Sequence, residues 1–153
     1  MSVAFRRESD EEHKEPRFEL PLPPGPNLVT ERGYALIKAR TEQLEAALAS
    51  AAADEQRAEL QRDLRYWRAR FATAQFAPVP TGEAVAFGTR VTLDQDGRTR
   101  SLTIVGHDEA DPASGLIAFT SPLAKALIGA EAGEEVTVPG PANCVRVLSI
   151  ARA

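Results

Sequence analysis

Two runs of apolar residues at coiled-coil spacing occupy the first half of the chain, and they are out of phase with each other. The first run recurs at alternating steps of four and three and consists of Ile37, Thr41, Leu44, Leu48 and Ala51. The second run repeats those steps with Leu60, Leu64, Trp67, Phe71 and Ala74. Residues three and four apart share one face of an α-helix, so each run predicts a helix with an apolar seam. Extending the first seam would place Glu55, Ala58, Arg62 and Arg65 in apolar positions, so we expect the helix to break.

We expect the break between residues 52 and 56, with Thr30 as N-cap of the first helix and Asp54 as N-cap of the second. The two helices then fold back into an antiparallel hairpin, or coiled coil. A single unbroken helix is the alternative, because neither Gly nor Pro occurs at the expected turn. Trp67 and Phe71 lie at seam positions, which favours a place in the hairpin core over a stacking platform for bases.

The second half of the chain changes from helical to strand-like periodicity after a linker rich in Pro and Gly at 78–82. Short β-rich runs predict strands at 85–87, 90–93, 101–105, 116–119, 135–138 and 144–150. One helix interrupts them, with Ser121 as N-cap, Pro122 in the first turn and Gly129 at the end. The predicted fold is therefore α+β, a helical hairpin followed by a small antiparallel β-domain with one short helix.

The N-terminal region is charged and proline-rich, a composition that buries little apolar surface and favours extended backbone. The three expected regions are 1–27, an acidic and flexible tail; 28–77, the hairpin; and 78–153, the β-domain. Alternating Phe18, Leu20 and Leu22 leave an added edge strand as an alternative for the tail, which the flanking prolines disfavour.

Composition excludes several classes of function. A net charge of −4 argues against independent binding of duplex DNA, since affinity for phosphates comes from clustered Lys and Arg, and a protein partner is expected instead. A single cysteine, Cys144, and two histidines, His13 and His107, cannot assemble a disulfide or a zinc cluster. His107 has no triad partners and is expected to be a loop residue. No apolar run approaches the ~20 residues that span a bilayer, which predicts a cytoplasmic protein without membrane contact.

Several motifs of the second half occur together in a fixed order. They are "VAFGTRVTL" at 85–93, "LTIVGHDEAD" at 102–111, "SPLAKALIGAEAGEEV" at 121–136 and "NCVRVLSI" at 143–150. With "NLVTERGYALI" at 27–37 ahead of the hairpin, this order resembles the GreA/GreB family of bacterial transcription elongation factors. The resemblance implies that the β-domain has a fold like that of FK506-binding proteins. It also implies that this domain docks on a coiled coil of the largest RNA polymerase subunit, at the rim of the secondary channel.

The resemblance carries a set of polymerase-contacting residues over to this chain. They are Ser121, Pro122, Leu123 and Ala124 at the short helix, and Asp108, Glu109, Ala110 and Asp111 in the preceding loop. The alternative for Ser121 and Pro122 is that they only start a helix well. A prolyl isomerase, suggested by the domain topology, is disfavoured because Phe87 and Phe119 are the only aromatic residues from 78 onward.

The hairpin tip departs from the family pattern. Family members that cleave transcripts carry Asp-x-x-Glu-Asn there, which helps to hold a Mg²⁺ ion in the polymerase active site. Here Asp54 and Glu55 are adjacent, Arg57 stands where the second acid would lie, and no Asn follows. Each arm is also roughly ten residues shorter than in cleavage factors, which would withdraw the tip by ~15 Å.

The expectation is therefore a regulator of elongation that occupies the channel without being an enzyme and without a cofactor of its own. The alternative is a cleavage-stimulating factor that uses Asp54 and Glu55 with a Mg²⁺ held by the polymerase. Both residues could instead only complement the helix dipole. Arg57, Arg62, Arg65 and Arg68 are candidates for contact with nascent RNA or the channel wall. The alternative for these arginines is pairing with Glu42 and Glu45 across the hairpin.

Overall fold

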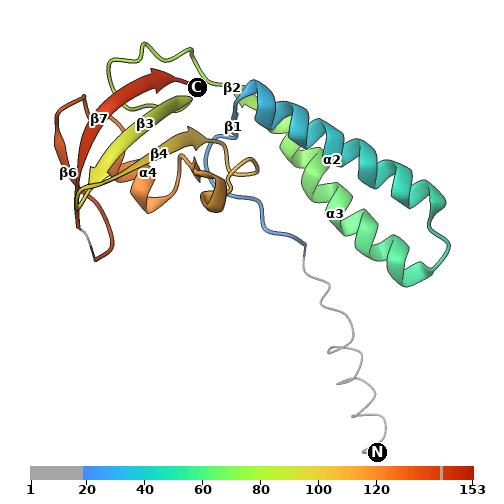
Figure 1. Cartoon of the computed structure of the whole chain (residues 1–153). Helices are drawn as coiled ribbons and strands as arrows, with labels where there is room; N and C mark the ends of the chain where they lie inside the picture. The colour runs from blue at the N-terminus through green and yellow to red at the C-terminus, as the bar shows by residue number, and fades with distance from the viewer. Residues whose placement is uncertain (1–18, 142) are drawn as a thin grey trace, which may run out of the picture.

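The chain folds into a helical hairpin that extends from a β-domain (Figure 1). The structure is a computed structural model that describes residues 19–141 and 143–153. Most of the predicted tail, including Phe18, therefore lies outside the described residues. In Figure 1 the two long helices run side by side away from the sheet, so the hairpin tip is the part of the hairpin farthest from the β-domain.

The hairpin consists of α2 (Glu31–Ser50) and α3 (Asp54–Thr73), which have 20 residues each. At 1.5 Å per residue, each helix is ~30 Å long. The apolar seams face each other, and Ile37, Leu44 and Leu64 are buried between the helices. Because the two runs are out of phase, only two separate helices can turn both seams inward, and the predicted hairpin is confirmed.

Of the two N-caps predicted for the hairpin helices, one is confirmed. Thr30 caps α2, and its hydroxyl accepts a hydrogen bond from the N–H of Gly33 at 3.0 Å. The prediction that Asp54 caps α3 is wrong, because Ala53 holds the N-cap position and contributes no side-chain hydrogen bond. Asp54 is already the first helical residue, where its charge complements the helix dipole.

The β-domain contains one five-stranded sheet in the order β5-β4-β3-β7-β6. Its strands are β3 (Thr89–Gln95), β4 (Arg98–Val105), β5 (Leu116–Ala118), β6 (Glu135–Thr137) and β7 (Cys144–Arg152). All pairings are antiparallel except β4 with β5, which is parallel. The parallel pair arises because the chain crosses back between β4 and β5 through a loop that contains the 3₁₀ turn η1 (Pro112–Ser114).

The predicted strand at 85–87 is absent from this sheet. The N–H of Val85 donates to the carbonyl of Ala130 at 2.8 Å, and the carbonyl of Val85 accepts from the N–H of Gly129 at 2.8 Å. This segment is therefore tied to the chain that follows the short helix, and its backbone groups are satisfied without a strand partner.

Helix α4 (Pro122–Leu127) packs on one face of the sheet and closes the core. Ser121 caps it as predicted, since its hydroxyl accepts from the N–H of Ala124 at 3.2 Å. Gly129 follows with a φ of +95°, a conformation that ends the helix and that glycine adopts without strain. The core consists of Val85, Val91, Leu93, Leu102, Ile104, Ile117, Ala124, Leu127, Ala130, Val138, Val145 and Val147.

A two-stranded parallel pair joins the hairpin to the β-domain. It consists of β1 (Leu28–Val29), before α2, and β2 (Gln75–Phe76), after α3. Gly106, at the end of β4, lies so close to this pair that a Cβ atom there would overlap the carbonyl oxygen of Leu28. The hairpin base is therefore seated directly against the β-domain.

Candidate functional site

The hairpin tip carries an arginine turned back onto the end of α2. The guanidinium Nη1 of Arg57 donates to the carbonyl of Leu48 at 3.0 Å and to that of Ala51 at 3.2 Å. The carbonyl of Leu48 also accepts from the N–H of the C-cap residue Ala51 at 3.3 Å, so Arg57 adds hydrogen bonds at the end of α2 and favours the turn. Asp54 and Glu55 are exposed beside it in the first turn of α3. The tip thus combines two exposed carboxylates with one hydrogen-bonded cation.

The other arginines of α3 are mostly paired with acidic side chains. Arg68 lies 3.2 Å from Glu45 across the hairpin, which is the arrangement that the pairing alternative predicts. Arg65 forms a 2.6 Å ion pair with Glu19, and Arg62 lies 3.6 Å from Asp63. These exposed or half-exposed pairs add little stability, yet they reduce the positive field along α3. Contact of these arginines with RNA stays a prediction.

The loop after β4 directs two of its acidic residues toward the hairpin. Asp108 accepts hydrogen bonds from the hydroxyl of Tyr66 at 2.5 Å and from Nε of Arg70 at 2.6 Å. Glu109 is buried and accepts from the hydroxyl of Thr30 at 2.5 Å. In this arrangement the Asp108 and Glu109 carboxylates that the resemblance assigns to polymerase contact are used within the chain.

Burial at this junction alters the ionisation of Tyr66. Burial first, and then the hydrogen bond to the Asp108 carboxylate, raise the pKa of Tyr66 well above its usual range. A deprotonated tyrosine would face that carboxylate without a proton between them. Neither Tyr66 nor Arg70 is predicted from the sequence to contact this loop, since both lie outside the seam and only the fold brings them to it.

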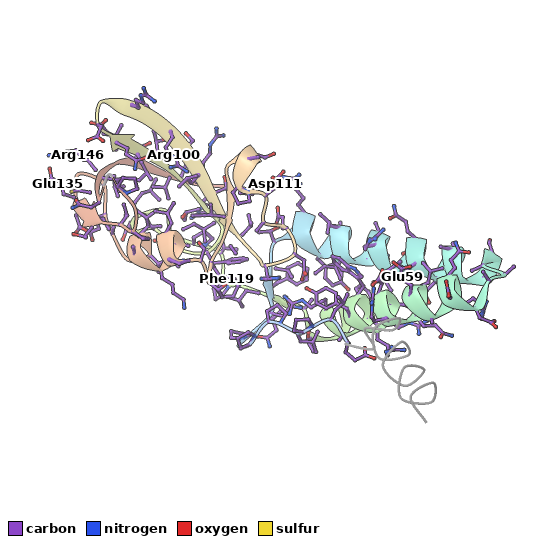
Figure 2. All side chains as sticks on the ribbon, turned by 90° about the horizontal axis from the view of Figure 1, so that it is seen from below. Glu59, Arg100, Asp111, Phe119, Glu135 and Arg146 are labelled. Carbon is purple, nitrogen blue, oxygen red and sulfur yellow. The ribbon has the colours of Figure 1, made fainter. Side chains whose placement is uncertain are left out.

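Asp111, the third acid of the loop, is exposed (Figure 2). It accepts a 2.7 Å hydrogen bond from the hydroxyl of Ser114 in the η1 turn. Asp111 is therefore the acid of this loop that presents its side chain to solvent.

The start of α4 presents a small surface of uneven exposure. Pro122 is exposed, Ser121 and Leu123 are half-buried, and Ala124 is buried in the core. Pro122 has no N–H, and the Ser121 hydroxyl already holds the N–H of Ala124. A partner protein could therefore contact apolar atoms and a hydroxyl group at this surface, whereas Ala124 packs in the core beneath it.

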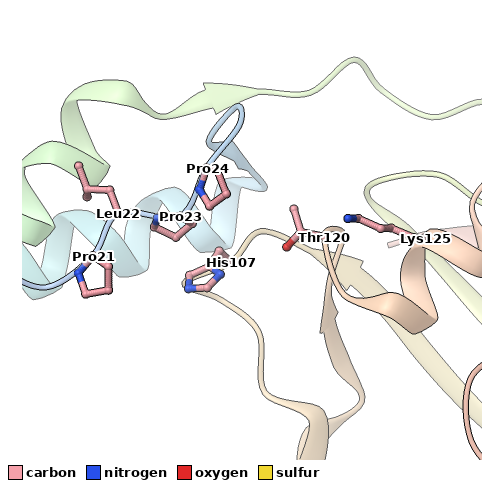
Figure 3. Close-up of a pocket in the computed structure, with 7 residues that line it drawn as sticks. All are labelled: Pro21, Leu22, Pro23, Pro24, His107, Thr120 and Lys125. Carbon is pink, nitrogen blue, oxygen red and sulfur yellow. The ribbon is translucent and has the colours of Figure 1, made fainter.

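Residues ahead of the hairpin line a groove beside α4 (Figure 3). One wall is made by Pro21, Leu22, Pro23 and Pro24, and the other by His107, Thr120 and Lys125. Sequence reasoning assigned residues 1–27 to a flexible tail and did not expect this packing. The signal was the proline run itself, because its stiff extended backbone can be held by few contacts.

Within residues 19–141 and 143–153, no three His, Cys, Asp or Glu side chains gather into a site that could hold a metal ion. In the same part of the chain, no helix is both long and apolar enough to cross a bilayer.

Comparison with known proteins shows what the second half of the chain is similar to. Residues 80–152 match the family model described as "Transcription elongation factor, GreA/GreB, C-term". The transcription elongation factor GreA of Desulfovibrio desulfuricans is 42% identical over 82 residues, which are 51% of this chain and 51% of that protein. GreA of Nitratidesulfovibrio vulgaris is 35% identical over 94 residues, 59% of this chain and 58% of that protein. The chain thus spans about half the length of these curated relatives.

Among solved structures, GreA factor homolog 1 (Gfh1) of Thermus thermophilus is similar, with 19% identity, a TM-score of 0.42, and coverage of 83% of this chain and 99% of that one. The family assignment rests on the C-terminal match and the GreA relatives, together with the hairpin and β-domain described above. Residues 80–152 of this chain therefore form a GreA/GreB C-terminal domain.

Proposed function

We propose that the protein binds bacterial RNA polymerase at the secondary channel and regulates transcript elongation without stimulating RNA cleavage. The support for the partner is the family membership carried by residues 80–152. The β-domain docks at the channel rim, and the hairpin occupies the entrance, where it competes with other factors that enter the channel. The protein is then a cytoplasmic regulator and not an enzyme, and it needs no cofactor of its own.

The proposed docking surface is formed by the start of α4 and the neighbouring loop. Pro122 and Asp111 are the exposed members, and Ser121 and Leu123 contribute their half-buried side chains. Asp108 and Glu109 act indirectly, because their hydrogen bonds to the hairpin fix the loop that carries Asp111. This division of roles replaces the uniform contact set that the resemblance implies.

The observation that carries the proposal of no cleavage is the position of Arg57. Mg²⁺ requires oxygen ligands in octahedral geometry, and a second metal in the polymerase would need carboxylates from the tip. At the tip an arginine occupies the place of the second acid and is held on the carbonyls of Leu48 and Ala51. A fixed cation beside Asp54 and Glu55 opposes the binding of a divalent cation. The ~30 Å arms add a second obstacle, since a short hairpin stops before the catalytic metal.

The decisive experiment measures RNA cleavage in purified, backtracked elongation complexes, with and without the protein, and with a cleavage-competent factor as competitor. We expect no shortened transcripts and dose-dependent suppression of the competitor. The cleavage alternative requires shortened transcripts that disappear in Asp54→Ala with Glu55→Ala. Glu42→Ala with Glu59→Ala is the control, because it removes two exposed acids from the hairpin away from the tip. Cleavage lost only in the tip variant would overturn the proposal.

Docking is tested separately by Ser121→Asp combined with Pro122→Ala. Aspartate is also a good N-cap, so α4 should persist while its exposed surface changes. We expect at least about ten-fold weaker binding to polymerase, as for substitutions at the centre of an interface. Ser149→Asp with Pro141→Ala changes the same residue types at other exposed positions of the β-domain and should bind normally. Equal affinity of both double variants would exclude this docking surface.

A further inference from the structure

Residues 19–27, here called the N-terminal strap, contact the hairpin at both ends. Glu19 forms a 2.6 Å ion pair with Arg65 of α3. At the other end, the buried amide of Asn27 donates to the carbonyl of Arg70 at 2.7 Å and to the hydroxyl of Thr73 at 3.2 Å. Between these anchors the strap runs past the β-domain, with prolines that stiffen its backbone.

The middle of the strap forms one wall of the groove that reaches α4. The groove has a volume of about 560 Å³, and its strap wall, Pro21–Pro24, is apolar. The opposite wall is polar, with the imidazole of His107, the hydroxyl of Thr120 and the ammonium of Lys125. Figure 3 shows Lys125 extending from α4 toward Thr120 and the strap. The groove directly adjoins Ser121, the residue after Thr120, and so continues the proposed docking surface.

The charge of the groove is positive, although the chain as a whole carries −4. Lys125 is exposed and makes no ion pair with any residue in the part of the chain that the structure describes. The two acids that follow His107 in the sequence are engaged with Tyr66, Arg70 and Thr30 of the hairpin side. An apolar wall opposite an unpaired ammonium suits a carboxylate side chain that has apolar neighbours.

We propose that this groove receives an acidic segment of RNA polymerase, with a partner carboxylate on Lys125 and apolar partner side chains against Leu22, Pro23 and Pro24. The inference rests on the proposed function and adds the strap to the docking surface. The buried amide of Asn27 holds one end of the strap, which lowers the ordering entropy that opposes binding, whereas the exposed Glu19 pair adds little. A nucleic acid fits the groove less well, because its described lining has one permanent cation and only the His107 imidazole as a ring for base stacking.

The test measures affinity for core RNA polymerase free of nucleic acid, by titration of the labelled full-length chain. Lys125→Glu reverses the charge, and Leu22→Ser with Pro23→Ser makes the strap wall polar while both anchors remain. Each variant should bind about ten-fold more weakly, as expected when a complementary contact is reversed or lost. The Lys125→Glu effect should shrink at high salt, because screening weakens the pair. Arg98→Glu, at the exposed first residue of β4, is the matched charge reversal and should bind normally.

The outcomes separate this inference from the proposed function. If the wild-type chain does not bind polymerase, the proposed function fails. If wild type binds, Ser121→Asp with Pro122→Ala does not, and both groove variants bind normally, only the groove inference is overturned. A groove effect that appears solely in complexes containing RNA would also overturn it, because the groove would then contact RNA. Lys125→Gln keeps a polar end group without the charge, and it should show a smaller loss of affinity than Lys125→Glu if the ion pair is the cause.

Discussion

Arg70 of α3 and Asp108 of the loop after β4 form an ion pair of 2.6 Å, with both side chains about 5% exposed or less. The pair joins the hairpin to the β-domain, and the hydroxyl of Tyr66 provides a second hydrogen bond to the same carboxylate. A buried carboxylate is tolerated when several donors surround it. The relative orientation of hairpin and β-domain is therefore stabilised by this polar cluster, together with the Thr30–Glu109 hydrogen bond and the packing of Gly106 on Leu28.

Asp108→Ala should destabilise the protein by roughly 3 kcal/mol, because it leaves the buried Arg70 guanidinium without its partner. The measurement is the free energy of unfolding from urea titration followed by circular dichroism. Arg70→Met combined with Asp108→Leu should lower the free energy of unfolding by less than the sum of the two single changes, since no charge is left unpaired. Strict additivity would show that the two groups do not interact.

Arg146→Ala supplies the contrast at the far end of the sheet. Arg146 lies 2.7 Å from Glu135, but both side chains are more than half exposed (Figure 2). An exposed pair contributes roughly 0–1 kcal/mol, so this variant should unfold nearly as the wild type does. A loss as large as that of Asp108→Ala would mean that burial is not what distinguishes the two pairs.

Tyr66→Phe should make stability less dependent on alkaline pH. The pKa of Tyr66 is raised in the folded protein, so above the usual tyrosine value of about 10 the unfolded chain loses its proton first. The stabilisation is complete below that pH and is lost as pH rises toward the folded pKa. The wild-type advantage over Tyr66→Phe should therefore decline from pH 10 upward, as followed by urea midpoints between pH 8 and 11. A constant difference over that range would contradict the assignment.

Gly106→Ala should destabilise the junction by about 1–3 kcal/mol, the usual cost of inserting atoms into a packed site. The added Cβ would meet the backbone carbonyl of Leu28, which cannot rotate away. Gly33→Ala is the comparison, since its Cβ would meet the Oε1 atom of Glu109 at 2.9 Å and a side chain can move. Alanine also favours the helix that contains residue 33, so this variant should lose less in thermal unfolding.

The sequence was sufficient for the features that depend on periodicity. The phase change between the two seams required a hairpin, and the Ser121–Pro122 start of α4 follows from local capping rules. The parallel pairing of β5 was not predicted, because pairing direction depends on a crossing loop whose path no local pattern specifies. The prediction of a strand at 85–87 was wrong for a related reason. The backbone groups of Val85 bond to Gly129 and Ala130, which lie after α4.

The candidate site was less predictable than the fold. Asp108 was expected at a partner surface, yet its carboxylate faces Tyr66 and Arg70 across long sequence separations. Side-chain direction in a loop is set by tertiary contacts, which a motif does not contain. The packing of the strap could not be predicted for another reason. A proline run that buries little apolar area has the composition of a flexible tail, and only tertiary contacts such as the hydrogen bond of Asn27 hold it in place.

Arg57→Glu separates the two obstacles to cleavage that we propose for the hairpin. The change restores an acid three residues after Asp54 and removes the hydrogen bonds to Leu48 and Ala51, at a cost of about 1 kcal/mol in urea unfolding. Gln56→Glu adds an acid at a neighbouring exposed position and leaves those hydrogen bonds intact, so it controls for charge alone. We expect neither variant to cleave RNA in backtracked complexes, because substitution does not lengthen the ~30 Å arms. Cleavage by Arg57→Glu alone would show that the chemistry of the tip, and not its reach, keeps this protein from acting as a cleavage factor.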